Sequence, residues 1–164
     1  MSDIKPCLWF TSEAENAANF YVGLFPESRI ASVMRSAPNA PAIAVDFVLD
    51  GTPFLALNGR EERGFTTACS FVVPCDSQAE IDRYWDALTD GGTAGRCGWL
   101  EDRFGISWQI VPRDMGALLG GPDAAAAGRA MRAMMGMSKI DIATMQRARD
   151  GVTIAEDAAS LNPR

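Results

Sequence analysis

The sequence predicts an α+β fold built from two tandem βαβββ modules and a helical C-terminus. Residues 7–58 contain a strand, a helix and further strands, and residues 69–112 repeat that order. The predicted helix of each copy carries a pair of aromatic residues, Phe20-Tyr21 in the first and Tyr84-Trp85 in the second. An internal repeat with a period of about sixty residues indicates that the two copies fold as similar modules.

The first module, residues 5–58, is predicted from short apolar runs and turn signals. Thr11 or Ser12 caps its helix, because residues 12–15 have the spacing of a capping box. Asp50-Gly51 is a strong signal for a hairpin turn between the last two strands. The strands are expected at residues 7–10, 31–35, 42–49 and 53–57.

The second module, residues 67–112, is predicted to repeat these elements. Its first strand ends at Pro74, its helix starts at Ser77, and Gly91-Gly92 closes that helix. The strands are expected at residues 68–73, 97–101 and 106–111. Residues 121–150 are expected to form two C-terminal helices, and the whole chain is expected to form one structural domain.

The composition bears on the partners that the protein can have. A net charge of −6 and a pI near 4.6 argue against binding to nucleic acid or to an anionic membrane, since both partners require a basic surface. No apolar run approaches the length of a membrane span, and the N-terminus lacks a signal-peptide core. These features predict a cytoplasmic protein with no nucleic-acid or membrane partner.

The reactive residue types are few. The chain has no histidine, which removes the usual general base, most metal sites and every Ser-His or Cys-His nucleophile arrangement. The cysteines form no Cys-x-x-Cys pair, so reduced and buried thiols are expected instead of a disulfide framework or a zinc site. They are Cys7, Cys69, Cys75 and Cys97.

Short motifs distributed over residues 5–150 carry a resemblance to a known family. They lie at residues 8–10, 17–21, 49–59, 97–100 and 107–112, and residues 134–149 add a C-terminal helical segment. In this order and spacing they resemble the PhnB-like branch of the vicinal oxygen chelate superfamily, which contains glyoxalase, bleomycin-resistance and extradiol-dioxygenase relatives. This branch is also labelled the 3-demethylubiquinone-9 3-methyltransferase domain.

The resemblance implies a glyoxalase/bleomycin resistance-like architecture. Two four-stranded mixed sheets would curl around a shared cavity, with each module contributing one wall. The resemblance also implies a homodimer. The apolar stripe in the C-terminal helices is expected to pack in the core, and an adaptable dimer seam is the alternative. The stripe consists of Met131, Met134, Met135 and Met137.

Metal-dependent members of this superfamily direct His or Glu side chains into the cavity from the first and last strands of each module. The matching positions here are Pro6 or Cys7, Leu57, Ser70 and Gln109. No carboxylate or imidazole is among them, and a hydroxyl or an amide oxygen is a weak ligand for a divalent transition metal. We therefore expect neither a metal nor another cofactor.

The matched positions also predict which residues line the cavity. Alternation along the last strand places Trp108 under the helices if Gln109 faces the cavity. Core packing is the favoured interpretation for the tryptophans, although Trp9 lies on a first strand that borders the cavity. The residues predicted to bind a ligand are Trp9, Asn58, Ser70 and Gln109. No catalytic residue can be assigned.

The methyltransferase label finds no support in the glycines of the sequence. A methyl donor usually binds at a glycine-rich turn from a strand to a helix, whereas residues 91–95 follow a helix and are expected to form a loop. The favoured function is therefore the binding of a small hydrophobic or aromatic molecule between the modules. A metal-independent enzyme that uses the same pocket and a ligand-free dimeric scaffold are the alternatives.

Overall fold

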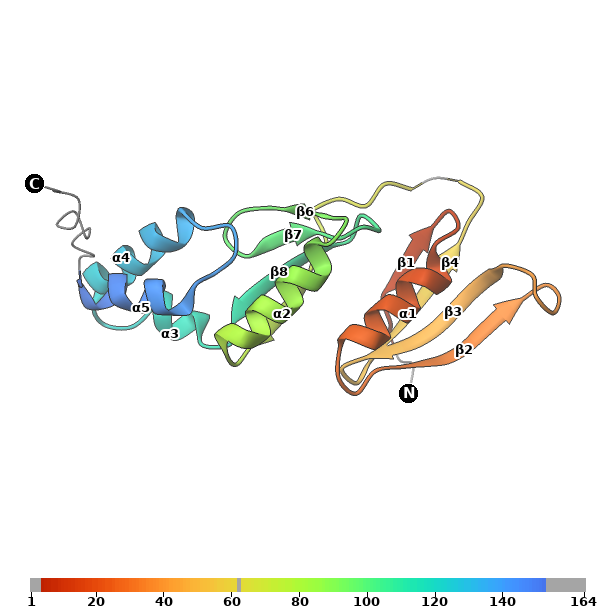
Figure 1. Cartoon of the computed structure of the whole chain (residues 1–164), viewed down its shortest axis with the longest axis horizontal. Helices are drawn as coiled ribbons and strands as arrows, with labels where there is room; N and C mark the ends of the chain where they lie inside the picture. The colour runs from red at the N-terminus through yellow and green to blue at the C-terminus, as the bar shows by residue number, and fades with distance from the viewer. Residues whose placement is uncertain (1–3, 62, 153–164) are drawn as a thin grey trace, which may run out of the picture. The chain divides into compact units, whose positions relative to one another are not determined.

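The structure, a computed structural model, describes residues 4–61 and 63–152. The chain separates into two compact units, Met1–Thr66 and Thr67–Arg164. Each unit contains one four-stranded sheet with a helix packed on one of its faces (Figure 1). The predicted α+β architecture of two βαβββ modules followed by helices is confirmed.

The first unit is a sheet of strand order β1-β4-β3-β2 with α1 across it (Figure 1). Strands β1 and β4 are parallel, and the other neighbours are antiparallel. The elements are β1 (Cys7–Phe10), α1 (Ala14–Leu24), β2 (Arg29–Arg35), β3 (Ala42–Leu49) and β4 (Thr52–Asn58). The buried face of α1 consists of three alanines and Tyr21. It packs on buried side chains of the sheet, which include Leu8, Phe10 and Phe47. Because alanine side chains are short, the helix backbone lies close to the sheet in this core.

The turn between β3 and β4 is the predicted hairpin. Asp50 and Gly51 have φ angles of 45° and 76°, as a two-residue type I′ turn requires. The start of α1, by contrast, was predicted wrongly. Its N-cap position is Glu13, and Ser12 hydrogen-bonds the Glu13 side chain instead of a helical N–H. The N–H of Ala14 in the first turn of α1 donates to the side chain of Asn58 at the end of β4. A long-range contact therefore replaces the local cap.

The second unit contains a sheet of strand order β5-β8-β7-β6, with β5 parallel to β8. The elements are β5 (Phe71–Cys75), α2 (Gln78–Thr89), β6 (Thr93–Ala94), β7 (Trp99–Glu101) and β8 (Ser107–Pro112). Ser77 caps α2 as predicted, because its hydroxyl accepts from Glu80 N at 3.3 Å and Glu80 accepts from Asp76 N at 2.7 Å.

Three details of this sheet differ from the prediction. The first strand was expected to begin at residue 68, but β5 begins at Phe71 because residues 67–69 form a turn and a bend. Residues 93–94 form the short strand β6 on β7, in a segment expected to be a loop. Pro74 lies inside β5 and does not end it. The proline is tolerated because β5 is an edge strand of this sheet, next to β8.

The C-terminal part forms α3 (Met115–Leu119), α4 (Ala124–Met135) and α5 (Ile142–Asp150). The helices predicted to begin at Asp123 and Asp141 are confirmed, and each aspartate accepts from a backbone N–H three residues later. Helix α3 was not predicted.

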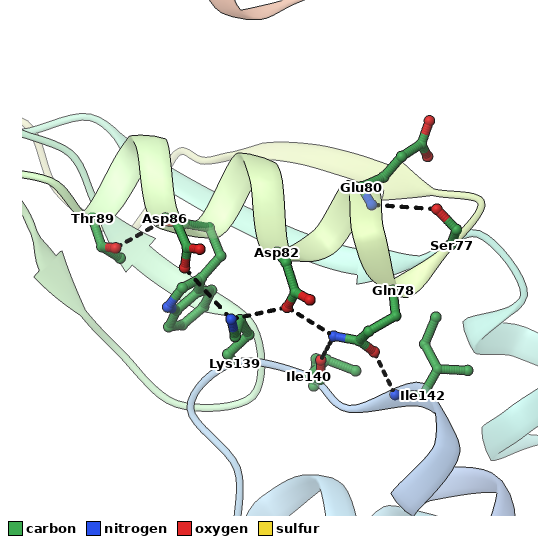
Figure 2. Close-up of polar contacts among 10 residues, drawn as sticks. Ser77, Gln78, Glu80, Asp82, Asp86, Thr89, Lys139, Ile140 and Ile142 are labelled. Carbon is green, nitrogen blue, oxygen red and sulfur yellow. Dashed lines mark hydrogen bonds and ion pairs between the residues drawn. The ribbon is translucent and has the colours of Figure 1, made fainter.

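A segment before α5 joins these helices to α2 (Figure 2). Gln78 Nε2 donates to the carbonyl oxygen of Ile140 at 3.0 Å, and Gln78 Oε1 accepts from Ile142 N at 3.0 Å. Lys139 forms an ion pair with Asp82 at 2.9 Å. The Ile140 side chain is fully buried. The C-terminal helices are therefore part of the folded core of the second unit.

The methionine stripe was predicted to pack in the core, and this is wrong for two of its members. Met131 and Met135 are 41% and 54% exposed in the single chain. The buried residues of α4 are instead Ala126 and Ala130, and Arg129 of α4 donates to the carbonyl oxygens of Ala148 and Arg149 in α5. A role for the methionines in a dimer seam stays a prediction.

Within the described part of the chain, no helix has both the length and the apolar character needed to cross a membrane.

Candidate functional site

Each face of the second sheet carries its own set of side chains. Paired residues on neighbouring strands point to the same face, so the register places Trp108 with Phe71 and Leu100. Trp108 is 3% exposed and lies on the face that α2 covers. Gln109 points to the opposite face, as alternation predicted, and we call this opposite surface the open face of the second sheet.

The open face brings together Ser70 and Gln109, the two residues predicted from this module. Gln109 Nε2 donates to Ser70 Oγ at 2.9 Å, and both side chains are half-buried. Ser70 immediately precedes β5, and Gln109 lies on the neighbouring strand β8. Two residues separated by 39 positions thus form one neutral polar pair.

Apolar side chains flank this pair. Gln109 is paired in register with Val72 on one side and with Trp99 on the other. Val72 is 56% exposed, and Trp99 is half-buried. Trp99 was not among the four residues predicted to bind a ligand. Its register with Gln109 becomes visible only when the β7–β8 hairpin is formed.

The first unit places Trp9 on the face of its sheet opposite to α1, in register with Leu57. The indole N–H donates to the carbonyl oxygen of Glu61 at 3.0 Å. The Arg63 guanidinium lies 5.8 Å from the ring centroid, and a Cβ at Gly59 would overlap the ring. The polar segment after β4 therefore packs on Trp9 and holds it in place, and binding of a ligand by Trp9 stays a prediction.

Asn58 has a structural role at the end of β4. Its Oδ1 accepts from Ala14 N at 2.9 Å, and its Nδ2 donates to the carbonyl oxygen of Ala42 at 2.9 Å. The side chain thereby supplies the N-terminal cap of α1 from a distant strand. Contact of Asn58 with a ligand stays a prediction.

The positions matched to metal ligands do not provide a suitable donor set. Ser70 and Gln109 offer a hydroxyl and an amide, while Cys7 and Leu57 belong to the other unit. Within residues 4–61 and 63–152, no group of three or more His, Cys, Asp or Glu residues could hold a metal ion. Neutral oxygen and nitrogen donors of this kind fit a divalent transition metal poorly.

The glycine segment also does not form a phosphate- or donor-binding turn. Gly91 follows the C-cap residue Asp90 of α2 with a φ angle of 76°, and Thr93 begins β6. The segment thus ends a helix and leads into a strand, which is the reverse of a strand-to-helix turn at a cofactor phosphate.

Asp102 lies in the turn between β7 and β8. Its side chain is 3% exposed and accepts from three N–H groups. They are Phe104 N at 2.8 Å, Ile106 N at 3.1 Å and Trp108 Nε1 at 2.8 Å. Asp102 therefore fixes the β7–β8 turn and the orientation of Trp108, which in turn places Gln109 on the open face.

The cysteines are free thiols with different surroundings. Cys7 and Cys69 are exposed, so the prediction that they are buried is wrong. Cys75 is buried, and burial raises the pKa of its thiol to about 11. It borders a pocket of about 440 Å³ where the ends of β5 and β8 approach α3 and α5.

Comparison with known proteins agrees with this fold. The family model described as 3-demethylubiquinone-9 3-methyltransferase matches residues 2–111. The chain is similar to a PhnB protein from Bacillus cereus, with 31% identity, a TM-score of 0.61, and coverage of 67% of this chain and 99% of that one. A comparison with curated proteins gives no match.

More distant solved structures show the fold alone. Protein PA1353 from Pseudomonas aeruginosa has 21% identity and a TM-score of 0.56, over 68% of this chain and 98% of that one. The fosfomycin resistance protein FosX from Mesorhizobium loti has 14% identity and a TM-score of 0.51, over 66% and 89%. The family match ends at residue 111, so α3, α4 and α5 lie beyond it.

Proposed function

Because the chain belongs to the 3-demethylubiquinone-9 3-methyltransferase family, with a glyoxalase/bleomycin resistance-type fold, we propose that it binds a small, neutral, largely apolar molecule on the open face of the second sheet. The molecule would contact Ser70 and Gln109 through hydrogen bonds and Val72 and Trp99 through apolar surface. Binding would require no metal.

The observation that carries this proposal is the neutral Ser70–Gln109 pair between apolar side chains. A sheet with one face covered by a helix usually exposes polar residues on the other face. Here Val72 of β5, which is 56% exposed, lies beside the Ser70–Gln109 pair. Apolar surface supplies affinity when it is removed from water, and a few neutral polar groups fix the orientation of a ligand.

The charges of the sheet favour a neutral ligand. The strands β5, β6, β7 and β8 contain no Lys or Arg, and their single charged residue is Glu101. A phosphate or carboxylate ligand needs a cation or a set of N–H donors to offset its loss of hydration. The open face offers neither on its strands, so an uncharged aromatic molecule suits it better.

Binding is favoured over catalysis for a chemical reason. The chain has no imidazole, and the polar pair on the open face consists of a hydroxyl and an amide, neither of which is an effective base at neutral pH. A metal-independent enzyme and a ligand-free scaffold stay the alternatives, and turnover of a bound probe would favour the enzyme.

Isothermal titration calorimetry with 2-naphthol tests the proposal. We expect saturable binding by the purified full-length protein, weakened at least tenfold by Val72→Asp. Val33→Asp is the matched control, because Val33 is also an exposed strand valine, 37% exposed, but lies in the first unit. Absence of binding, or equal weakening by the two variants, would refute the proposed site.

A further inference from the structure

We infer that the Ser70–Gln109 pair recognises a hydrogen-bond donor and a hydrogen-bond acceptor that are adjacent on the ligand. The preferred ligand is then a planar apolar ring system with a neutral, amide-like edge, such as a lactam. This inference rests on the proposed function, since it specifies the chemical class of molecule that the open face of the second sheet binds.

The inference follows from the hydrogen-bonding capacity of the two side chains. A primary amide has two N–H donors and one acceptor oxygen, and a hydroxyl has one donor and acceptor lone pairs. Gln109 uses one N–H to reach Ser70 Oγ at 2.9 Å. Because Ser70 Oγ accepts in this bond, its own proton points elsewhere. Within residues 4–61 and 63–152, no other hydrogen bond is formed by either of these side chains.

The pair therefore presents two complementary groups side by side. Gln109 Oε1 can accept a hydrogen bond from the ligand, and the Ser70 O–H can donate one to it. A lactam carries an N–H donor bonded to the carbon of its C=O acceptor, so it can satisfy both groups at once. The internal Gln109–Ser70 bond holds the two groups in a fixed relation before the ligand arrives, which reduces the entropy lost on binding.

The neighbours of the pair match the ring of such a ligand. Val72 and Trp99 lie in register on the two sides of Gln109, so a flat molecule that bonds to the pair lies against apolar surface. A charged edge would be less suitable, because Glu101 is the only charged residue of these strands and would repel an anion. The lactam edge is polar without being charged.

Titration calorimetry with three related probes tests this specificity. 2-Quinolinone has the adjacent N–H and C=O, 1-methyl-2-quinolinone has lost the donor, and naphthalene has neither group. We expect 2-quinolinone to bind about tenfold more tightly than its N-methyl derivative, which corresponds to about 1.4 kcal/mol. This comparison uses the wild-type protein, so it does not depend on how a variant folds.

Two variants then assign the effect to the pair. Gln109→Leu should remove the acceptor and make the two quinolinones bind equally. Ser70→Ala should weaken 2-quinolinone about tenfold, whereas Ser12→Ala, which removes an exposed hydroxyl in the first unit, should leave binding unchanged. Circular dichroism checks that the folded content of each variant matches the wild type.

The outcomes separate this inference from the proposed function. If neutral aromatic probes bind and Val72→Asp weakens them, but the two quinolinones bind equally to the wild type, the lactam specificity is refuted and the binding function stands. If none of the probes binds, the proposed function itself fails. A preference for 2-quinolinone that persists in Gln109→Leu would also refute the assignment to this pair.

Discussion

The buried side chain of Asp102 gives the sharpest test of how this fold is held together. In the structure its carboxyl group accepts from the backbone N–H groups of Phe104 and Ile106 and from the indole of Trp108. Replacing Asp102 with alanine leaves all three donors without this acceptor. Replacing it with asparagine keeps an oxygen for some of them but turns an amide N–H₂ toward another donor.

The expected loss of stability is large for a turn residue. A buried N–H without a partner costs about 1–3 kcal/mol, and neighbouring losses are not fully additive. We therefore expect Asp102→Ala to lower the free energy of unfolding of the second unit by about 4 kcal/mol and Asp102→Asn by about 2 kcal/mol. Since domains are stable by about 5–15 kcal/mol, the alanine variant should lie near the limit of folding.

Equilibrium unfolding in urea, followed by tryptophan fluorescence, measures this effect. Three of the four tryptophans, at positions 85, 99 and 108, belong to the second unit, so the signal mainly reports its unfolding. Asp50→Asn is the matched control, because Asp50 is exposed and asparagine also tolerates its φ angle of 45°. This substitution should change the free energy of unfolding by less than about 0.5 kcal/mol. Equal effects of the two asparagine variants, or a loss below about 1 kcal/mol in Asp102→Ala, would refute the reasoning.

Three further predictions concern the thiols, the assembly and metal binding. Burial raises the pKa of Cys75 to about 11, so at pH 8 iodoacetamide should modify the exposed Cys7 and Cys69 before Cys75. Peptide mass spectrometry measures the order of modification, and rapid modification of Cys75 would contradict this prediction. This pKa in the folded protein lies above the ordinary value of 9.0. The contribution of the buried, neutral Cys75 thiol to the free energy of unfolding is therefore fully present below pH 9 and is lost as the pH rises through 11. Light scattering of the wild type should give a mass of about twice the chain mass of 17.6 kDa. Met135 is exposed in the single chain, so Met135→Lys should reduce the measured mass to that of the monomer. A monomeric wild type would disprove the dimer. Elemental analysis should find no stoichiometric transition metal, and one equivalent of zinc, iron, nickel or manganese per chain would overturn the metal-free proposal.

Much of the fold could be predicted from the sequence because the relevant signals are local. The repeated order of apolar runs indicated two modules, and Asp50-Gly51 specified a turn that needs two left-handed residues. Alternation along the last strand placed Gln109 and Trp108 on opposite faces. Side chains alternate with a period of two in any strand, so this assignment required no knowledge of the neighbouring strands.

The candidate site depended more on tertiary contacts. The family resemblance suggested Ser70 and Gln109 separately, but only the parallel pairing of β5 with β8 joins them by a hydrogen bond. Contact of Asn58 with a ligand stays a prediction, and only the fold shows that its amide also caps α1 from a strand 44 positions away.

The sequence by itself determined most of the strands, helices and turns, because propensity, capping and alternation act over a few residues, whereas α3, β6 and the cap of α1 were not predicted. Only the tertiary structure decided how polar and apolar side chains are used. Asp102 is buried and accepts from the indole N–H of Trp108, while Met131 and Met135 stay exposed because the buried face of α4 is formed by Ala126 and Ala130. Burial depends on which surfaces the whole chain brings together, and no short stretch of sequence contains that information.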